Sequence, residues 1–233
     1  MDLGLPFAKV DETLSLRGID YRDIDAVCIT HEHADHVSGL KSFMKRTECP
    51  VYISKGTYLE LSDFKAEDRS KRIKFVKHHD SFNFDDMKVF VLEKPHDSKE
   101  SISFVFDDGL KKAGVFTDLG HVNNEIKHML KNLDLIFFEA NYCEKYVKDS
   151  DEKLSSVYLN RIMSDVGHLG LHQTIDALVD CAHDLQKIVL SHVSENTNSY
   201  ENVYSQIREA LNNVSKFPEI FVGFQGEPTE WIE

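Results

Sequence analysis

The order of apolar and polar positions predicts strands and helices in turn over the first third of the chain. Residues 23–30, which contain the apolar run at 26–29, predict a buried strand, and residues 50–54 predict a shorter one. Residues 37–46 and 57–64 place apolar side chains at helical spacing. Strands that alternate with helices are typical of an α/β fold.

Short strands dominate the middle of the sequence. Between residues 72 and 116 the pattern indicates an antiparallel meander, with strands at 73–77, 87–92, 102–106 and 111–116. Beyond it we expect helices at 124–131, 152–163, 171–182 and 199–212, and strands at 135–139, 187–191 and 219–222. No repeat or long linker interrupts this order. We therefore expect one α/β domain over residues 1–233, with two sheets facing each other and helices outside.

The composition fits one protein core and no membrane segment. The chain has 233 residues, of which 41% are hydrophobic, enough for one sizeable core. It has no apolar run of about 18 residues and no signal peptide, so we expect a cytoplasmic protein without membrane association. Its four cysteines are scattered, which favours reduced thiols over disulfides.

The net charge bears on nucleic-acid binding. A formal charge of -13 disfavours a protein that coats nucleic acid regardless of sequence, because phosphate contacts need an excess of cations. A local basic segment at residues 69–77 alternates cations with apolar residues. It is either the solvated face of an edge strand or a track for a phosphate backbone.

Candidate metal ligands crowd together directly after the first predicted strand. His31 and His33 are two positions apart on an extended segment, so their side chains point the same way and can bind one ion. Asp35 and His36 follow where the chain turns into the next predicted helix, and they can face a second ion. Imidazole and carboxylate groups suit zinc, manganese or iron. The spacing therefore predicts two neighbouring metal sites.

Further ligands are needed, because a catalytic zinc takes at least three from the protein. His96, Asp118 and His192 each follow a predicted strand. His96 would complete the first site and His192 the second, and the Asp118 carboxylate can bridge two cations. Because α/β proteins gather their sites at the C-terminal ends of strands, we expect these side chains to meet there.

This pattern of HxHxDH at residues 31–36, followed by His96, Asp118 and His192, resembles the metallo-β-lactamase superfamily. The resemblance implies a four-layer αββα sandwich with a binuclear site for two divalent ions, zinc or manganese. It implies that the first ion is held by His31, His33 and His96. It implies that the second is held by Asp35, His36 and His192, with Asp118 as the bridge.

Longer strings resemble the YycJ/WalJ-like branch of that superfamily, which is linked to exonuclease action on DNA. They are TDLG at 117–120, FEANY at 138–142, GHL at 167–169 and LSHVSEN at 190–196. Two departures stand out. Relatives carry an N-terminal strand pair ahead of the segment matching residues 2–6, so either the start is trimmed or one sheet lacks its first strands. The branch commonly has GHLSN where this chain reads GHLGL at 167–171, which affects the expected substrate contacts.

The resemblance implies phosphodiester hydrolysis by a metal-bridging hydroxide, with DNA as the expected nucleic-acid substrate. The catalytic residues would be Asp35, Asp118 and His168. His168 is the candidate general acid for the leaving oxygen, and Glu139 could orient His168 or a ligand. The substrate contacts would be His168, Asn141 and Asn196.

Two other functions remain open at this point. The same metal site could hydrolyse a small phosphodiester, a thioester or a lactone. A non-catalytic nucleic-acid-binding or regulatory module would be expected to lose metal ligands, and this chain keeps all of them. The sequence does not indicate an oligomeric state.

Overall fold

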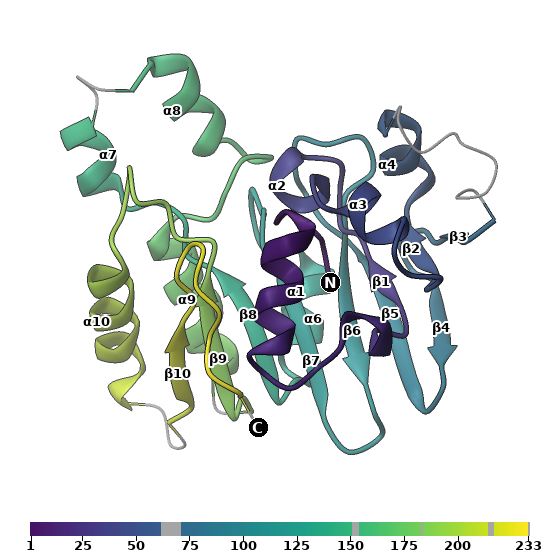
Figure 1. Ribbon diagram of the computed structural model, residues 1–233. Helices are drawn as coiled ribbons and strands as arrows, with labels where there is room; N and C mark the ends of the chain where they lie inside the picture. The colour runs from purple at the N-terminus through teal and green to yellow at the C-terminus, as the bar shows by residue number, and fades with distance from the viewer. Residues whose placement is uncertain (62–70, 151–153, 183, 214–216, 233) are drawn as a thin grey trace. The chain divides into compact units, whose positions relative to one another are not determined.

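The computed structural model describes residues 1–61, 71–150, 154–182, 184–213 and 217–232. The chain divides into two compact units. Unit 1 comprises Met1–Asp80 with Ser98–Ile102, and unit 2 comprises Ser81–Asp97 with Ser103–Glu233. A three-stranded and a seven-stranded sheet, each accompanied by helices, confirm the predicted α/β class (Figure 1). The single domain over residues 1–233 stays a prediction.

Unit 1 is built on a parallel sheet whose strand order is β1-β2-β3. The strands are β1 (Val27–Cys28), β2 (Val51–Ile53) and β3 (Ile73–Phe75). The helices are α1 (Phe7–Ser15), the 3-10 helix η1 (Tyr21–Asp23), α2 (Ala34–Val37), α3 (Leu40–Met44) and α4 (Lys55–Glu60). Their apolar side chains form one cluster that includes the buried residues Ile29, Leu40, Phe43, Val51 and Ile53.

Three predictions for unit 1 need correction. The strand expected over 23–30 is confined to β1, because η1 occupies its start. The helix expected over 37–46 is two short helices that break at Gly39. The backbone near the N-terminus reaches this break: Gly39 N donates to Leu3 O at 2.7 Å, and a Cβ at Gly39 would lie 1.9 Å from Leu5 O. The third correction is that β3 pairs in parallel with β2 and does not join a meander.

Two more elements of unit 1 differ from the sequence pattern. Helix α1 was not predicted, and β1 is the first strand among the described residues. Helix α4 occupies only part of the predicted 57–64, whose last three positions lie outside the described residues.

Unit 2 holds the sheet whose strand order is β10-β9-β8-β7-β6-β5-β4, from yellow to blue in Figure 1. The strands are β4 (Ser81–Phe84), β5 (Met87–Glu93), β6 (Ile102–Asp107), β7 (Lys112–Phe116), β8 (Leu135–Glu139), β9 (Lys187–Ser191) and β10 (Glu219–Val222). The helices are α6 (Asn124–Leu130), α7 (Glu144–Ser150), α8 (Ser156–Ile162), α9 (Leu171–Cys181), α10 (Tyr200–Ala210) and the 3-10 helix η3 (Leu211–Asn213).

The strands of unit 2 follow the predictions closely where they are long and apolar. Antiparallel pairs β4–β5 and β6–β7 confirm that part of the meander, although β4 itself was not predicted. Strands β7, β8, β9 and β10 run in parallel. Side chains of β7, β8 and β9 share one buried cluster with α6, α9 and α10, which includes Phe116, Phe138 and Leu190. This packing anchors the strand ends that carry the predicted ligands.

Two helices precede the loop that leads into α9. Helix α7 was not predicted, and α8 is shorter than the predicted 152–163, whose first two positions lie outside the described residues. Ser155 caps α8 by accepting a hydrogen bond from Tyr158 N, which explains where the helix begins. Buried Val147 of α7 packs with Leu159 and Ile162 of α8. None of the helices in the described part of the chain has the length and apolar character that a membrane span requires.

Candidate metal centre

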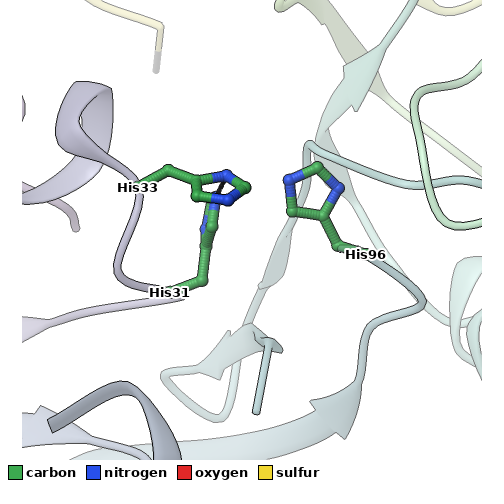
Figure 2. A group of neighbouring side chains, drawn as sticks. All are labelled: His31, His33 and His96. Atoms are coloured by element: carbon green, nitrogen blue, oxygen red, sulfur yellow. Dashed lines mark hydrogen bonds between the residues drawn. The ribbon is translucent and has the colours of Figure 1, made fainter. Parts of the chain in front are cut away.

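The histidines of unit 1 lie on the extended segment that follows β1. Nε2 of His31 is 3.0 Å from Nδ1 of His33, and the two rings meet edge to face (Figure 2). Two nitrogens bound to one tetrahedral zinc are roughly 3.3 Å apart, given zinc–nitrogen distances of about 2.0–2.1 Å. Close nitrogens need a proton or a cation between them, so this pair suits one ion. His96, also labelled in Figure 2, belongs to unit 2 and is described with it.

Asp2 supports the same segment. Its Oδ2 accepts a hydrogen bond from Nδ1 of His36 at 2.9 Å and another from the hydroxyl of Thr30 at 3.0 Å. Its Oδ1 accepts a hydrogen bond from the backbone N–H of Thr30 at 2.8 Å. Because a carboxylate only accepts, Nδ1 of His36 carries the proton and Nε2 keeps its lone pair. That Nε2 lies 3.5 Å from Oδ2 of Asp35, the neighbouring predicted ligand.

In unit 2 the register of the parallel strands brings Asp118, Glu139 and His192 to one end of the sheet. Phe116 of β7 pairs with Phe138 of β8, which pairs with Leu190 of β9. Each of the three polar residues lies one or two positions beyond that row. Asp118 and His192 both adopt left-handed backbone conformations, with φ of 56° and 55°. Such positions are uncommon outside glycine, and they turn the chain sharply as each strand ends.

Asp118 is the centre of the polar cluster in unit 2. Its side chain is 2% exposed, and Oδ1 lies 3.3 Å from Nε2 of His192 and 3.8 Å from Nε2 of His96. The same oxygen is 3.7 Å from Nδ1 of His168. Asp118, Glu139, His168 and His192 each offer one ligand atom within 4.8 Å of the others. This arrangement gathers oxygen and nitrogen donors around one buried point.

Glu139 orients two histidines with one carboxylate oxygen. Oε1 accepts hydrogen bonds from Nδ1 of His168 and from Nδ1 of His192, both at 2.8 Å. Burial of Glu139 would by itself raise its pKa, but the hydrogen bonds from both histidines lower the pKa overall. The carboxylate is therefore an anion at neutral pH, and it holds a proton on Nδ1 of each ring, so Nε2 is the nitrogen left for a metal or a substrate.

His96 is oriented by the backbone of the loop before α9. Its Nδ1 donates to the carbonyl oxygen of Gly167 at 3.0 Å, which leaves the lone pair on Nε2. Burial lowers the pKa of His96 to about 4, against an ordinary value of 6.5. His96 is therefore a neutral imidazole at physiological pH, the form that binds metals.

The donor sets of both units fit divalent cations. In unit 1, His36 presents an unprotonated nitrogen, and His31 and His33 present a close nitrogen pair. In unit 2, His96 and His192 present unprotonated nitrogens beside an anionic carboxylate. Neutral imidazole with carboxylate is the ligand chemistry of zinc and manganese. Metal-binding histidines typically donate their other ring N–H to a carboxylate or a backbone carbonyl oxygen, as these histidines do.

The predicted substrate contacts occupy different environments. Asn141 is 7% exposed, and its amide donates to the carbonyl oxygen of His192 at 2.8 Å, so it holds the loop that carries a predicted ligand. Asn196 is exposed on that loop. His168 lies at the end of the loop before α9, with its side chain 13% exposed. Their contacts with substrate stay predictions.

The basic segment at residues 69–77 includes an edge strand and an arginine that bonds to the backbone of unit 1. Arg69 and Ser70 lie outside the described residues. Arg72 donates to the carbonyl oxygens of Met44 and Thr47, and its guanidinium is thereby engaged in unit 1. Lys74 is exposed on β3, which is an edge strand, and Lys71 and Lys77 are exposed just before and just after it. The edge-strand interpretation fits this placement.

Sequence reasoning missed three residues that each lie beside a predicted ligand of their own unit. Asp2 has no local motif that reveals its contact with His36. Lys94 is buried with its Nζ 3.8 Å from Oδ2 of Asp118. Asp97 forms an ion pair with both Nε and Nη2 of Arg161. The one sequence feature that could have pointed to Lys94 and Asp97 is their position within two residues of His96.

The family described as "Beta-lactamase superfamily domain" matches residues 8–193, most of the chain. This chain belongs to that family.

Two relatives in this superfamily are similar over most of their length. Exodeoxyribonuclease YycJ of Bacillus anthracis is 25% identical over 212 residues, covering 91% of this chain and 80% of the relative. Exodeoxyribonuclease WalJ of Streptococcus pneumoniae is 26% identical over 206 residues, covering 86% and 75%. The YycJ-like resemblance is thereby confirmed.

A solved structure shows the same fold. Zinc-bound PqqB from Methylobacterium extorquens matches with a TM-score of 0.68 at 14% identity, covering 89% of this chain and 73% of that chain. The chain therefore has the α/β metallo-β-lactamase fold. It is a metal-dependent hydrolase of this superfamily, and its described residues include groups of histidines and aspartates that could hold a divalent metal ion.

Proposed function

We propose that this chain is a binuclear metal-dependent phosphodiesterase that acts on DNA as an exonuclease. The arrangement around Asp118 carries the proposal, because one oxygen of this buried carboxylate lies within 3.8 Å of ring nitrogens of His96, His168 and His192. Two relatives named exodeoxyribonuclease, at 25% and 26% identity, support DNA as the substrate class.

The proposed centre holds two divalent ions, zinc or manganese. The first ion would be held by His31, His33 and His96. The second would be held by Asp35, His36 and His192, and Asp118 would be the shared carboxylate. Bound divalent ions supply two things: they lower the pKa of water to about 7, and they stabilise negative charge on a phosphate.

His168 supplies the proton that the leaving oxygen needs. Nδ1 of His168 is hydrogen-bonded to Glu139 at 2.8 Å, so Nε2 of His168 is the nitrogen available for proton transfer to substrate. A positioned general acid contributes roughly 10²–10⁴-fold to the rate. Glu139 stabilises the protonated ring, and Asn141 holds the His192 loop. Asn196 contacts the substrate. We also propose that the protein is cytoplasmic.

A small phosphodiester is the second candidate substrate. The net charge of -13 favours it, because a polyanionic strand is repelled by an acidic protein except where cations gather. A thioester or lactone could react at the same metals. A non-catalytic binding module is the third function, and the retained set of ligand residues argues against it.

One experiment separates these functions. Purified protein loaded with Mn²⁺ or Zn²⁺ is incubated with end-labelled single- and double-stranded DNA, and in parallel with bis-p-nitrophenyl phosphate. Stepwise shortening of DNA from one end supports the exonuclease. Cleavage of the small ester with intact DNA overturns it, and turnover of neither supports a non-catalytic module. Asp118→Asn should abolish activity, whereas Asp108→Asn, at an exposed turn, should retain it.

A further inference from the structure

Lys94 is a buried cation that the proposed reaction does not use. It directly follows β5 and lies two positions before His96, and its side chain is 0% exposed. Burying an ammonium group is costly unless an opposite charge lies close to it. The opposite charge here is Asp118, whose Oδ2 is 3.8 Å from Nζ of Lys94.

The two oxygens of Asp118 face different partners. Oδ1 is directed to the imidazoles, with Nε2 of His192 at 3.3 Å, whereas Oδ2 is directed to Lys94. Glu139, the other buried carboxylate of unit 2, receives its hydrogen bonds from His168 and His192. Lys94 therefore places a positive charge beside Oδ2 of Asp118, whereas His192 lies beside Oδ1.

We propose that Lys94 is the resident counter-ion of Asp118. It compensates the charge of this carboxylate when the centre holds no metal, and it thereby lowers the affinity of the centre for divalent cations. This inference rests on the proposed metal centre. The physical reason is that a fixed cation and an incoming cation share one carboxylate, and their repulsion is weakly screened in a buried site.

A purely structural role makes a different prediction. If Lys94 only filled space with its aliphatic stem, a neutral residue of similar length would leave metal affinity unchanged. If it only oriented Asp118 through their ion pair, losing that contact would weaken metal binding. A counter-ion is distinguished because its removal makes metal binding tighter.

The first test measures metal affinity. Metal-free protein is titrated with Zn²⁺ against a chromophoric chelator, for wild type, Lys94→Met and Lys94→Gln. We expect both variants to bind at least tenfold more tightly, because Met and Gln both remove the positive charge that lies 3.8 Å from Oδ2 of Asp118. Lys112→Met is the matched control, since Lys112 pairs with Asp107 at 3.2 Å on β7 and should not change the affinity. Unchanged or weaker binding by the Lys94 variants overturns the proposal.

The second test needs no metal. Thermal unfolding of metal-free protein is compared for Lys94→Met, Asp118→Asn and the double variant. We expect the double variant to be more stable than the sum of the single effects, because neither charge is then left buried alone. If Lys94→Met does not fold, the double variant should restore folding. Additive effects, or a double variant that also fails to fold, overturn the proposal.

The two tests distinguish failure of the proposed metal centre from failure of the counter-ion proposal. If wild-type protein binds no Zn²⁺ or Mn²⁺, the proposed metal centre fails. In that case the unfolding experiment still decides whether Lys94 compensates Asp118. If wild type binds metal and the Lys94 variants bind it no more tightly, the centre stands and the counter-ion proposal fails.

Discussion

Oε1 of Glu139 lies 2.8 Å from Nδ1 of His168, and the Glu139 side chain is fully buried. The carboxylate therefore fixes which ring nitrogen carries the proton and keeps Nε2 of His168 available. Because the same oxygen also bonds His192 at 2.8 Å, one buried anion orients both a proposed acid and a proposed ligand.

Replacing Glu139 by Gln should lower turnover about 10–100-fold, since partners that orient ligands typically contribute that much. The measurement is kcat for bis-p-nitrophenyl phosphate, with bound metal determined in parallel. Glu144→Gln is the control, because Glu144 is 48% exposed on α7 and pairs with His172. Wild-type turnover in Glu139→Gln would contradict the orienting role.

Replacing His168 by Ala should affect substrates according to their leaving groups. Loss of a general acid should cost roughly 10²–10⁴-fold on DNA, whose leaving oxygen needs a proton. The loss should be much smaller on bis-p-nitrophenyl phosphate, because p-nitrophenolate leaves without protonation. Equal losses on both substrates would rule out proton donation by His168. His172→Ala, at an exposed position on α9, should leave both rates unchanged.

Replacing Asp2 by Asn should weaken metal binding about 10–100-fold. Asn can still accept a hydrogen bond from Thr30, but it loses the charge that holds Nδ1 of His36. Zn²⁺ titration of metal-free protein measures the effect, with Asp25→Asn at an exposed position as the control. If both variants bind as wild type does, Asp2 does not support the centre.

Replacing Gly167 by Ala should destabilise the loop that carries His168. A Cβ there would lie 2.2 Å from Arg161 O and 2.5 Å from Ile162 O, so backbone must move. Overpacking of this kind costs about 1–3 kcal/mol, or roughly 2–4 °C in Tm per kcal/mol at this chain length. Gly223→Ala is the control, because its nearest atom would be 3.7 Å away. Equal Tm values for the two variants would contradict the close approach at Gly167.

The metal-free protein should lose stability as the pH falls from about 6.5 towards 4. His96 has a pKa lowered by burial to about 4, so in this window the unfolded chain binds a proton that the folded protein does not. Stability therefore rises with pH across the window. Thermal unfolding in chelator at several pH values measures the slope, and His96→Gln should flatten it. An unchanged slope in that variant would contradict a buried, neutral His96.

The fold was predictable where a segment's own pattern decides its structure. Strand β8 spans Leu135–Glu139 and strand β9 spans Lys187–Ser191, as predicted. Each is a short apolar run, and such a run identifies a buried strand from its own sequence. Helix α7 was missed because its sequence is largely polar and its buried Val147 is covered by α8. The break at Gly39 was missed because it depends on the backbone of Leu3 and Leu5.

The sequence by itself determined the class of chemistry and predicted a ligand set for it. His31 and His33 share a direction because of the two-residue period of extended chain, and Asp118 and His192 follow strands that are recognisable locally. Only the tertiary structure decided how these groups are oriented and charged. Asp2 reaches His36 across 34 positions and Glu139 reaches His192 across 53. Such contacts depend on how strands and loops are packed, which the spacing of residues along a chain does not encode.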